Sequence, residues 1–265
     1  MTTGGSARRA SAVGGSARHA LSAVAPIALV LAAWEAATRS GAIRTQVLPA
    51  FSSVCAAIVD LVASGELSRH LGVSLGRAFG GLALSIVVGV LLGFGMAANR
   101  HVRNFFDPLL SLVYPLPKTA LVPLTMVWFG LTHQAAILVI FLACLLPMVI
   151  NTYHGVRGVD RMLLWSARSL GTSERRLFTR VVVPAAMPSI VNGVRIALPI
   201  AFIVVISVEL VASRAGVGNL INGYGSMGVY DYMFATILVF VAMAFIADRC
   251  LVRLGRALLR WHETQ

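Results

Sequence analysis

Apolar runs of about twenty residues recur along the chain, and they constrain its fold more than any other feature. As an α-helix, a run of this length spans the hydrocarbon core of a bilayer. One example is "LGRAFGGLALSIVVGVLLGFGMAA", Leu75–Ala98. Hydrophobic residues make up 58% of the 265-residue chain and charged residues 12%, against roughly a quarter charged residues in a soluble domain. The sequence therefore predicts an all-α protein that crosses the membrane several times.

About six spans are predicted. Their approximate bounds are Leu21–Arg39, Leu75–Ala98, Leu109–Leu131, Gln134–His154, Asn192–Ala212 and Tyr232–Leu251. Residues 1–19 are rich in Gly, Ser, Ala and Arg, which predicts a disordered cytoplasmic tail before a transmembrane domain over residues 20–265. A cleaved signal peptide is the alternative. An uncleaved first helix is favoured, because the run from Ala20 to Ala37 is long and contains Trp34 and Glu35.

A shorter amphipathic segment separates the first two spans. Val54, Ile58, Leu61 and Val62 fall on one face of a helix that follows a serine suited to the N-cap position. The segment is too short to span a bilayer. We expect a short helix at the membrane surface.

The positive charge of the chain predicts its orientation. A net charge of +12 suggests nucleic acid as a partner for a soluble protein, but arginines beside membrane spans instead set topology and contact lipid headgroups. Most of the arginines lie in the N-terminal tail, after the fourth span and at the C-terminus, which predicts that both termini are cytoplasmic. The smaller set expected on the outer side comprises Arg39, Arg44, Arg69, Arg77 and Arg214.

Residues 156–191 then form a cytoplasmic loop between the fourth and fifth spans. The segments "DRMLLWSARSL" and "SERRLFTRVVV" read as two helices joined by a turn at Gly171, with Ser173 as the second N-cap. Pro184 and Pro188 are expected to end the second helix. A helix-turn-helix at the membrane face is suited to docking on a partner. An ordinary solvated connection with cytoplasmic arginines is the alternative, and composition does not distinguish the two.

The same loop resembles the "EAA" loop of ABC-importer permeases, patterned EAA-x3-G-x9-I-x-L-P. The matching positions are Trp165, Ser166, Ala167, Gly171, Val181, Val183 and Pro184. From about residue 48 onward, "LPAFSSV", "RNFFDPLLSLVYPLPKTALVPLTMVWFG", "NTYHGVRGVD" and "ELVASRAGVGNLI" are similar to permeases of the nitrate/sulfonate/taurine type. Several motifs in order over most of the chain are a much stronger signal than one.

This resemblance implies an importer subunit of the bacterial inner membrane. In that family two permeases, here expected as a homodimer, form a pathway between them, and each rests its loop on an ABC ATPase subunit. ATP-driven closure of the ATPases switches the pathway, and an extracytoplasmic solute-binding protein delivers the substrate. The family glutamate, which helps hold the loop and its ATPase contact, is replaced here by Trp165, and Ser166 replaces an alanine. Arg168, Glu174 or apolar packing then makes the contact, or the coupling is tuned differently.

Nothing in the sequence predicts chemistry within the chain itself. A P-loop needs a lysine after glycine, whereas the single lysine, Lys118, follows "VYPLP". Energy therefore comes from a partner or from an ion gradient. The three cysteines have no CxxC spacing and the histidines form no HExxH pair, so no metal or other cofactor is predicted. A membrane-embedded enzyme is disfavoured because no span clusters catalytic residue types.

Two polar positions inside the spans are candidates for the translocation pathway. Lys118 lies among Pro115, Pro117 and Pro123, and such irregular backbone at membrane depth must be packed in protein or line a wet cavity. Lys118 either attracts an anionic substrate or snorkels or pairs with a carboxylate. Glu209 follows Pro199, which is expected to kink the fifth span. Glu209 either lines or gates the exit or bonds to Arg214 or a neighbouring helix.

The sequence thus predicts the permease subunit of an ABC importer for a small anionic solute of the sulfonate, taurine or nitrate class. It predicts no catalytic residues and no nucleic-acid partner. A secondary transporter driven by an ion gradient is the alternative. It is disfavoured because the spans show no inverted pair of broken segments.

Overall fold

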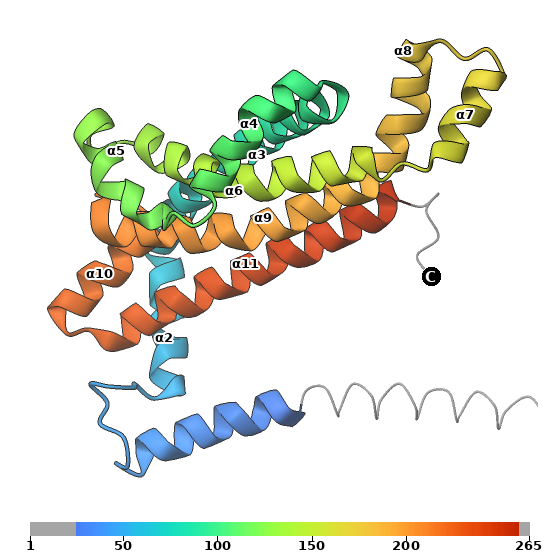
Figure 1. Cartoon of the computed structure of the whole chain (residues 1–265). Coiled ribbons are helices and arrows are strands. Elements are labelled where there is room, and N and C mark those ends of the chain that lie inside the picture. The colour runs from blue at the N-terminus through green and yellow to red at the C-terminus, as the bar shows by residue number, and fades with distance from the viewer. Residues whose placement is uncertain (1–24, 260–265) are drawn as a thin grey trace, which may run out of the picture.

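The computed structural model describes residues 25–259 and contains helices without a strand in that range. Residues 25–39 form the first helical stretch (Figure 1). The later helices are α2 (Phe51–Ala63), α3 (Glu66–Ala98), α4 (Arg100–Val113), α5 (Leu121–Phe129), α6 (His133–Arg157), α7 (Arg161–Ser169), α8 (Glu174–Leu177), α9 (Val183–Ala212), α10 (Val217–Met227) and α11 (Tyr230–Leu258). A 3-10 turn, Lys118–Ala120, precedes α5, and a π-helical turn, Phe178–Val182, joins α8 to α9.

Helices α3, α6 and α9 form the core of the bundle. Val139 and Ile140 of α6 are fully buried in one hydrophobic cluster with Ala197 and Val205 of α9. Close approach of α3 to α6 depends on glycine, because a Cβ at Gly89 would lie 2.5 Å from the Cβ of Met148. Small residues at such contacts let membrane helices pack backbone to backbone.

Four helices in the described part of the chain are long and apolar enough to cross a bilayer. They are Glu66–Ala98, His133–Arg157, Glu174–Val211 and Tyr230–Leu258, and a bent pair, Arg100–Val113 with Lys118–Phe129, raises the number to five if it is one span. The predicted number of six spans is therefore not confirmed. The first predicted span, Leu21–Arg39, begins outside the described residues. Its described part, residues 25–39, is helical. The predicted tail over residues 1–19 lies wholly outside them.

The third predicted span is broken. Its two halves meet at an angle of 84°, at the segment that carries Pro115 and Pro117. Proline lacks the backbone donor that an α-helix needs and restricts the residue before it, so two prolines in three residues end α4. The expectation of irregular backbone here is confirmed, and a span over Leu109–Leu131 stays a prediction, because the bent pair is either one broken span or a re-entrant loop.

A continuous stretch of 38 residues, Glu174–Val211, contains α8, the π-helical turn and α9 as far as Val211. The expectation that Pro184 and Pro188 end the second loop helix is therefore wrong. Pro184 lies in the first turn of α9, directly after the π-helical turn, and both Pro188 and Pro199 lie inside α9. A π-helical turn already departs from the α-helical hydrogen-bond pattern, which eases the accommodation of a proline beside it. Burial of α9 against α6 compensates for the missing hydrogen bonds.

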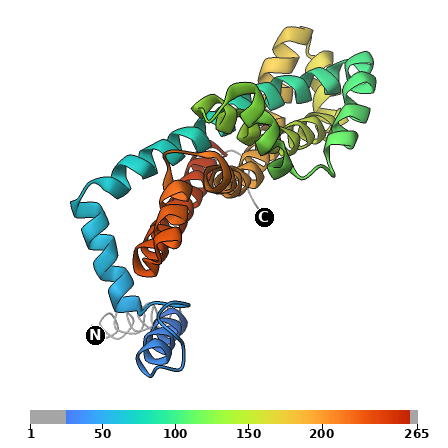
Figure 2. The same ribbon diagram turned by 90° about the vertical axis from the view of Figure 1, so that its left-hand side faces the viewer.

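A helix at the predicted amphipathic segment is confirmed as α2, although Val62 is exposed, and its place at the membrane surface stays a prediction. Val54, Ala57 and Leu61 are buried against Ala235 of α11. The N-cap is Ala50 and makes no side-chain capping bond, so the expected serine cap is wrong. Figure 2 shows α2 projecting from the end of α3, with residues 25–39 at its far end.

Candidate functional site

Helices α7 and α8 with their connecting turn, Arg161–Leu177, form a hairpin that extends from one end of α9 (Figure 1). Asp160 caps α7 by accepting a hydrogen bond from the backbone N–H of Met162 at 2.8 Å. The turn that ends α7 places Gly171 at φ +76°, a left-handed conformation that favours glycine. The predicted turn at Gly171 is confirmed.

An ion pair spans this turn. Arg168 donates from Nε to Oε1 of Glu174 at 2.9 Å and from Nη2 to Oε2 at 3.2 Å. The hydrogen bond to Glu174 is the main cause that raises the pKa of Arg168 above its usual value. Both side chains are largely exposed, so solvent screens the pair and it adds little to the stability of the fold.

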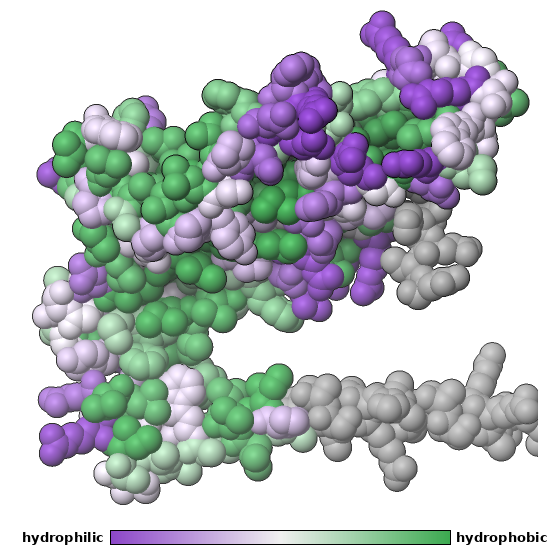
Figure 3. Space-filling view, viewed as in Figure 1, coloured by the Kyte–Doolittle hydropathy of each residue, from purple (hydrophilic) through white to green (hydrophobic). Residues whose placement is uncertain are grey.

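The α7–α8 hairpin carries exposed apolar side chains. Trp165 is 59% exposed and Leu170 85%, and Met162 and Leu163 are also more than half exposed. Ser166 is exposed and Ala167 half-buried. In Figure 3 hydrophilic residues gather over the hairpin and over the α3–α4 corner, in contrast to the apolar middle of the molecule. Exposed apolar residues set among charged ones are typical of a protein–protein contact.

The base of the hairpin is packed into the bundle. Leu177 is buried, and the ring of Phe178 lies 5.1 Å, centroid to centroid, from that of Phe94 on α3. The remaining predicted loop residues, Val181, Val183 and Pro184, are half-buried in the π-helical turn and the first turn of α9. The predicted loop residues therefore divide into an exposed tip and a packed base.

A buried polar cluster lies at the opposite end of α9. Glu209 is 1% exposed. Its Oε1 accepts from Nη1 of Arg77 at 2.8 Å, and its Oε2 accepts from Oγ of Ser74 at 2.7 Å and from the N–H of Gly218 at 3.0 Å. Glu209 thus bonds to a neighbouring helix, through Arg77 of α3 and not through Arg214, and its predicted place at the exit of the pathway stays a prediction.

Arg77 also holds the segment that joins α9 to α10. Its Nη1 donates to the carbonyl of Ala215 at 2.7 Å and to Oγ of Ser213 at 2.9 Å, and its Nε donates to Nδ1 of His133 at 3.1 Å. Arg77 is only 5% exposed. Its charge is therefore satisfied inside the protein, while its predicted place toward the outer side stays a prediction.

Two further side chains of α3 complete this contact. Oγ of Ser74 accepts from the N–H of Val217 at 2.8 Å, and Nδ1 of His70 lies 3.0 Å from the backbone nitrogen of Gly216. Gly216 has φ +118°, and a Cβ there would lie 2.3 Å from the Glu209 carboxyl carbon. We call His70, Ser74, Arg77, Glu209 and residues 213–218 the distal cluster. The helical spacing of the three α3 residues is the sequence signal that would have indicated it.

Lys118, at the break between α4 and α5, has a structural role. Its Nζ donates to the carbonyls of Val113 and Tyr114, both at 2.8 Å, and so caps the C-terminus of α4. It also lines a cavity of 380 Å³ with Tyr114, Asn151 and Ile200. Pro115 and Pro117 are exposed nearby. Pro199 is also exposed and lies roughly 15 Å along α9 from Glu209. The five candidate pathway residues thus do not form one site.

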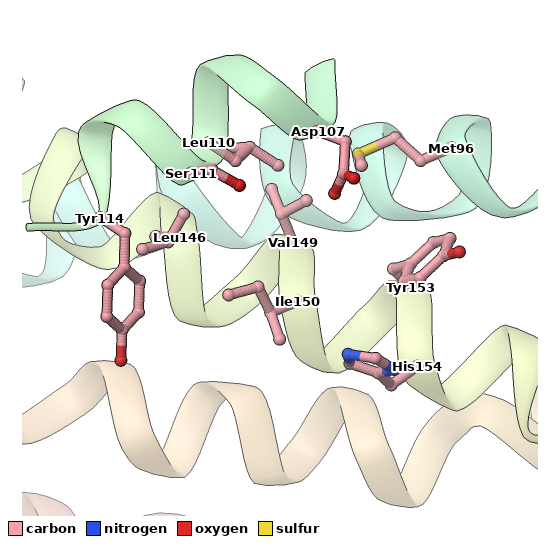
Figure 4. Close-up of a pocket in the computed structure, with 10 residues that line it drawn as sticks. All are labelled: Met96, Asp107, Leu110, Ser111, Tyr114, Leu146, Val149, Ile150, Tyr153 and His154. Carbon is pink, nitrogen blue, oxygen red and sulfur yellow. The ribbon is translucent and has the colours of Figure 1, made fainter. Parts of the chain in front are cut away.

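A second cavity, of 310 Å³, adjoins the first between α4 and α6. Figure 4 shows the Asp107 carboxylate directed into it from α4, with Tyr153 and His154 on the α6 side. Tyr114, Leu146 and Ile150 line both cavities. The two cavities therefore lie next to each other along one side of α6.

The motifs, the exposed hairpin and the broken span together indicate a transport permease. Residues 85–260 match the family of the binding-protein-dependent transport system inner membrane component. The chain belongs to this family. It is 32% identical to the putative aliphatic sulfonates transport permease of Bacillus subtilis, in an alignment that covers 89% of this chain and 86% of the relative. It is 33% identical to the taurine transport system permease of Escherichia coli, in an alignment that covers 74% of this chain and 71% of the relative.

Solved structures support the fold of this permease. A structure of the MetNI methionine ABC transporter in an inward-facing conformation superposes with a TM-score of 0.58 at 20% identity, over 76% of this chain and 97% of that one. A crystal structure of an amino acid ABC transporter with histidines superposes with a TM-score of 0.60 at 17% identity, over 77% of this chain and 97% of that one. The permease is an importer-type, multi-pass protein of the bacterial plasma membrane.

Proposed function

We propose that the permease forms, as a homodimer, the translocation pathway for a small anionic solute and is driven by a separate ABC ATPase that binds the α7–α8 hairpin. The observation that carries this proposal is the continuity of the hairpin with a core helix. Helix α8 runs through the π-helical turn into α9, which packs on α6. A partner that moves the hairpin tip therefore displaces a helix of the bundle directly.

In this proposal both termini and the hairpin face the cytoplasm, and the distal cluster faces outward, where a solute-binding protein delivers the substrate. The arginines around the hairpin support the orientation, since positive residues favour the cytoplasmic side. Trp165 takes the place of the family glutamate and provides an apolar anchor for the ATPase, which its 59% exposure permits. Arg168 and Glu174, which pair with each other, hold the shape of the turn.

The substrate class rests on Lys118. The ammonium group has three donors, of which two bond to the carbonyls of Val113 and Tyr114. Because Lys118 also lines the 380 Å³ cavity, the third donor is available to an anion there. Relatives named as aliphatic sulfonate and taurine permeases support a sulfonate. A relative named as a formylaminopyrimidine permease shows that similar chains also serve other solutes.

The test is uptake into proteoliposomes that contain the permease, its ATPase and its binding protein. We expect uptake of a sulfonate to require ATP and to persist when the proton gradient is collapsed. Uptake that continues without nucleotide while the proton gradient is intact would instead establish a secondary transporter. Lys118→Gln is expected to reduce sulfonate uptake while leaving ATPase binding unchanged, because the hairpin is not altered.

A further inference from the structure

The distal cluster lies at the end of the helix that the ATPase is proposed to move. From Glu174 to Val211 that helix contains 38 residues, which is roughly 57 Å of axial length. Its first turn belongs to the α7–α8 hairpin and its last turn carries Glu209. Displacement of one end of a helix moves other elements at the far end only where the far end is attached to them. The distal cluster provides that attachment.

We propose that the Arg77–Glu209 pair is a positioning device that attaches the far end of α9 to α3 and to the α9–α10 segment, so that these elements move as one unit during transport. This inference rests on the proposed function. Arg77 and Glu209 touch no substrate in this account. They act through the segment 213–218, whose backbone they hold.

The hydrogen bonds of the pair support this role. Nη1 of Arg77 contacts Glu209 of α9, and the same nitrogen contacts the Ala215 carbonyl in the connecting segment. Glu209 in turn accepts from the N–H of Gly218 in the first turn of α10. One buried pair thus joins α3, α9 and α10. The contacts to Ala215 and Gly218 are made to backbone atoms, so they fix the path of the chain and not merely the side chains.

Substitution of both partners distinguishes a buried ion pair that positions the backbone from one that only stabilises the fold. Removal of one partner leaves a buried charge without compensation, whereas replacement of both by apolar residues of similar volume is often neutral or stabilising. A pair that only stabilises the fold is therefore replaceable by two apolar residues. A pair that positions the backbone through hydrogen bonds cannot be replaced in this way, because methionine offers neither the donor for the Ala215 carbonyl nor the acceptor for the Gly218 N–H.

The experiment compares Glu209→Gln, Ser74→Ala and the double variant Arg77→Met/Glu209→Met in the reconstituted complex. The readouts are the thermal midpoint of the purified complex and the number of ATP molecules hydrolysed per sulfonate imported. Arg214→Gln, in the same segment but exposed, is the matched control. We expect the double variant to assemble with a lowered thermal midpoint, because the Ala215 carbonyl and the Gly218 N–H lose their partners, and to raise the number of ATP molecules hydrolysed per sulfonate about tenfold. Ser74→Ala is expected to raise it less.

A double variant that regains both the thermal midpoint and the wild-type ratio would show that the pair only fills space. Should the double variant fail to assemble, Ser74→Ala decides, because it removes hydrogen bonds to Glu209 and Val217 without altering a charge; an unchanged ratio in that variant overturns the proposal. Failure of the proposed function is distinguishable from either result, because it would appear as ATP-independent uptake by the wild-type complex.

Discussion

At one end of the long α8–α9 helix, the α7–α8 hairpin exposes a tryptophan and a leucine and closes its turn with an ion pair open to solvent. At the other end, the distal cluster buries its ion pair and satisfies both carboxylate oxygens. Exposed pairs form and break at little cost, whereas buried pairs do not. The first end is thus suited to a partner that binds and moves, and the second to a fixed geometry.

The largest expected effect contrasts the two glutamates. Glu209→Ala leaves Arg77 buried without its charge partner and is expected to lower the free energy of unfolding by about 3 to 5 kcal/mol. Glu174→Ala, at the solvated pair, is expected to leave stability unchanged. Thermal unfolding of both purified variants in the same detergent measures the difference. Equal loss of stability would remove the contrast between the two ends.

Two of the glycines with positive φ, one at each end of the α8–α9 helix, give the next largest contrast. Gly216→Ala places a methyl group 2.3 Å from the Glu209 carboxyl carbon at φ +118° and is expected to cost about 2 to 5 kcal/mol through strain and overlap. Gly171→Ala meets no atom within 4 Å and is expected to cost about 1 kcal/mol from its backbone conformation alone. Denaturation curves of the two variants test this order, which a larger effect at Gly171 would reverse.

Trp165 tests what the exposed end binds. Trp165→Ala is expected to weaken ATPase association roughly tenfold or more, as for a buried aromatic anchor at an interface, without lowering the thermal midpoint. Trp165→Glu restores the family residue and is expected to weaken association as well, because a carboxylate does not replace an apolar anchor. Co-purification with the ATPase at increasing salt gives the comparison. Wild-type affinity in the alanine variant would assign the docking contact to other residues.

The smallest expected effect belongs to the hairpin ion pair. Arg168→Gln removes the charge opposite Glu174 but keeps an amide that can still bond across the turn. We expect unchanged stability and a modest loss of transport. The comparable loss of charge at the other end, Glu209→Gln, should reduce transport much more. Uptake rates of the two variants at equal protein amounts show which end of the α8–α9 helix matters more for transport.

The sequence predicted features that depend on neighbouring residues in the chain. Apolar runs located the long helices, and apolar periodicity located α2. Gly171 indicated the hairpin turn, because that turn depends only on a local backbone conformation. Features that depend on distant contacts were missed. Arg77 reads as a flanking arginine until Glu209, 132 residues away, is placed beside it.

The prolines were informative only in context. Pro115 and Pro117 directly follow the end of α4, whereas Pro188 and Pro199 remain inside α9. The intrinsic preference of proline is the same in each case. Helix α9 packs against the core along its length, and that packing is not visible in one sequence.

The central claim is that the α7–α8 hairpin faces the cytoplasm and is covered by a separate ATPase. A single cysteine at Leu170, which is 85% exposed, in a variant whose native cysteines are replaced by serine, tests it with a maleimide that does not cross membranes. The account predicts labelling in inside-out vesicles stripped of ATPase, protection when ATPase is added, and none in intact spheroplasts. Labelling in spheroplasts, or no protection by the ATPase, would contradict it.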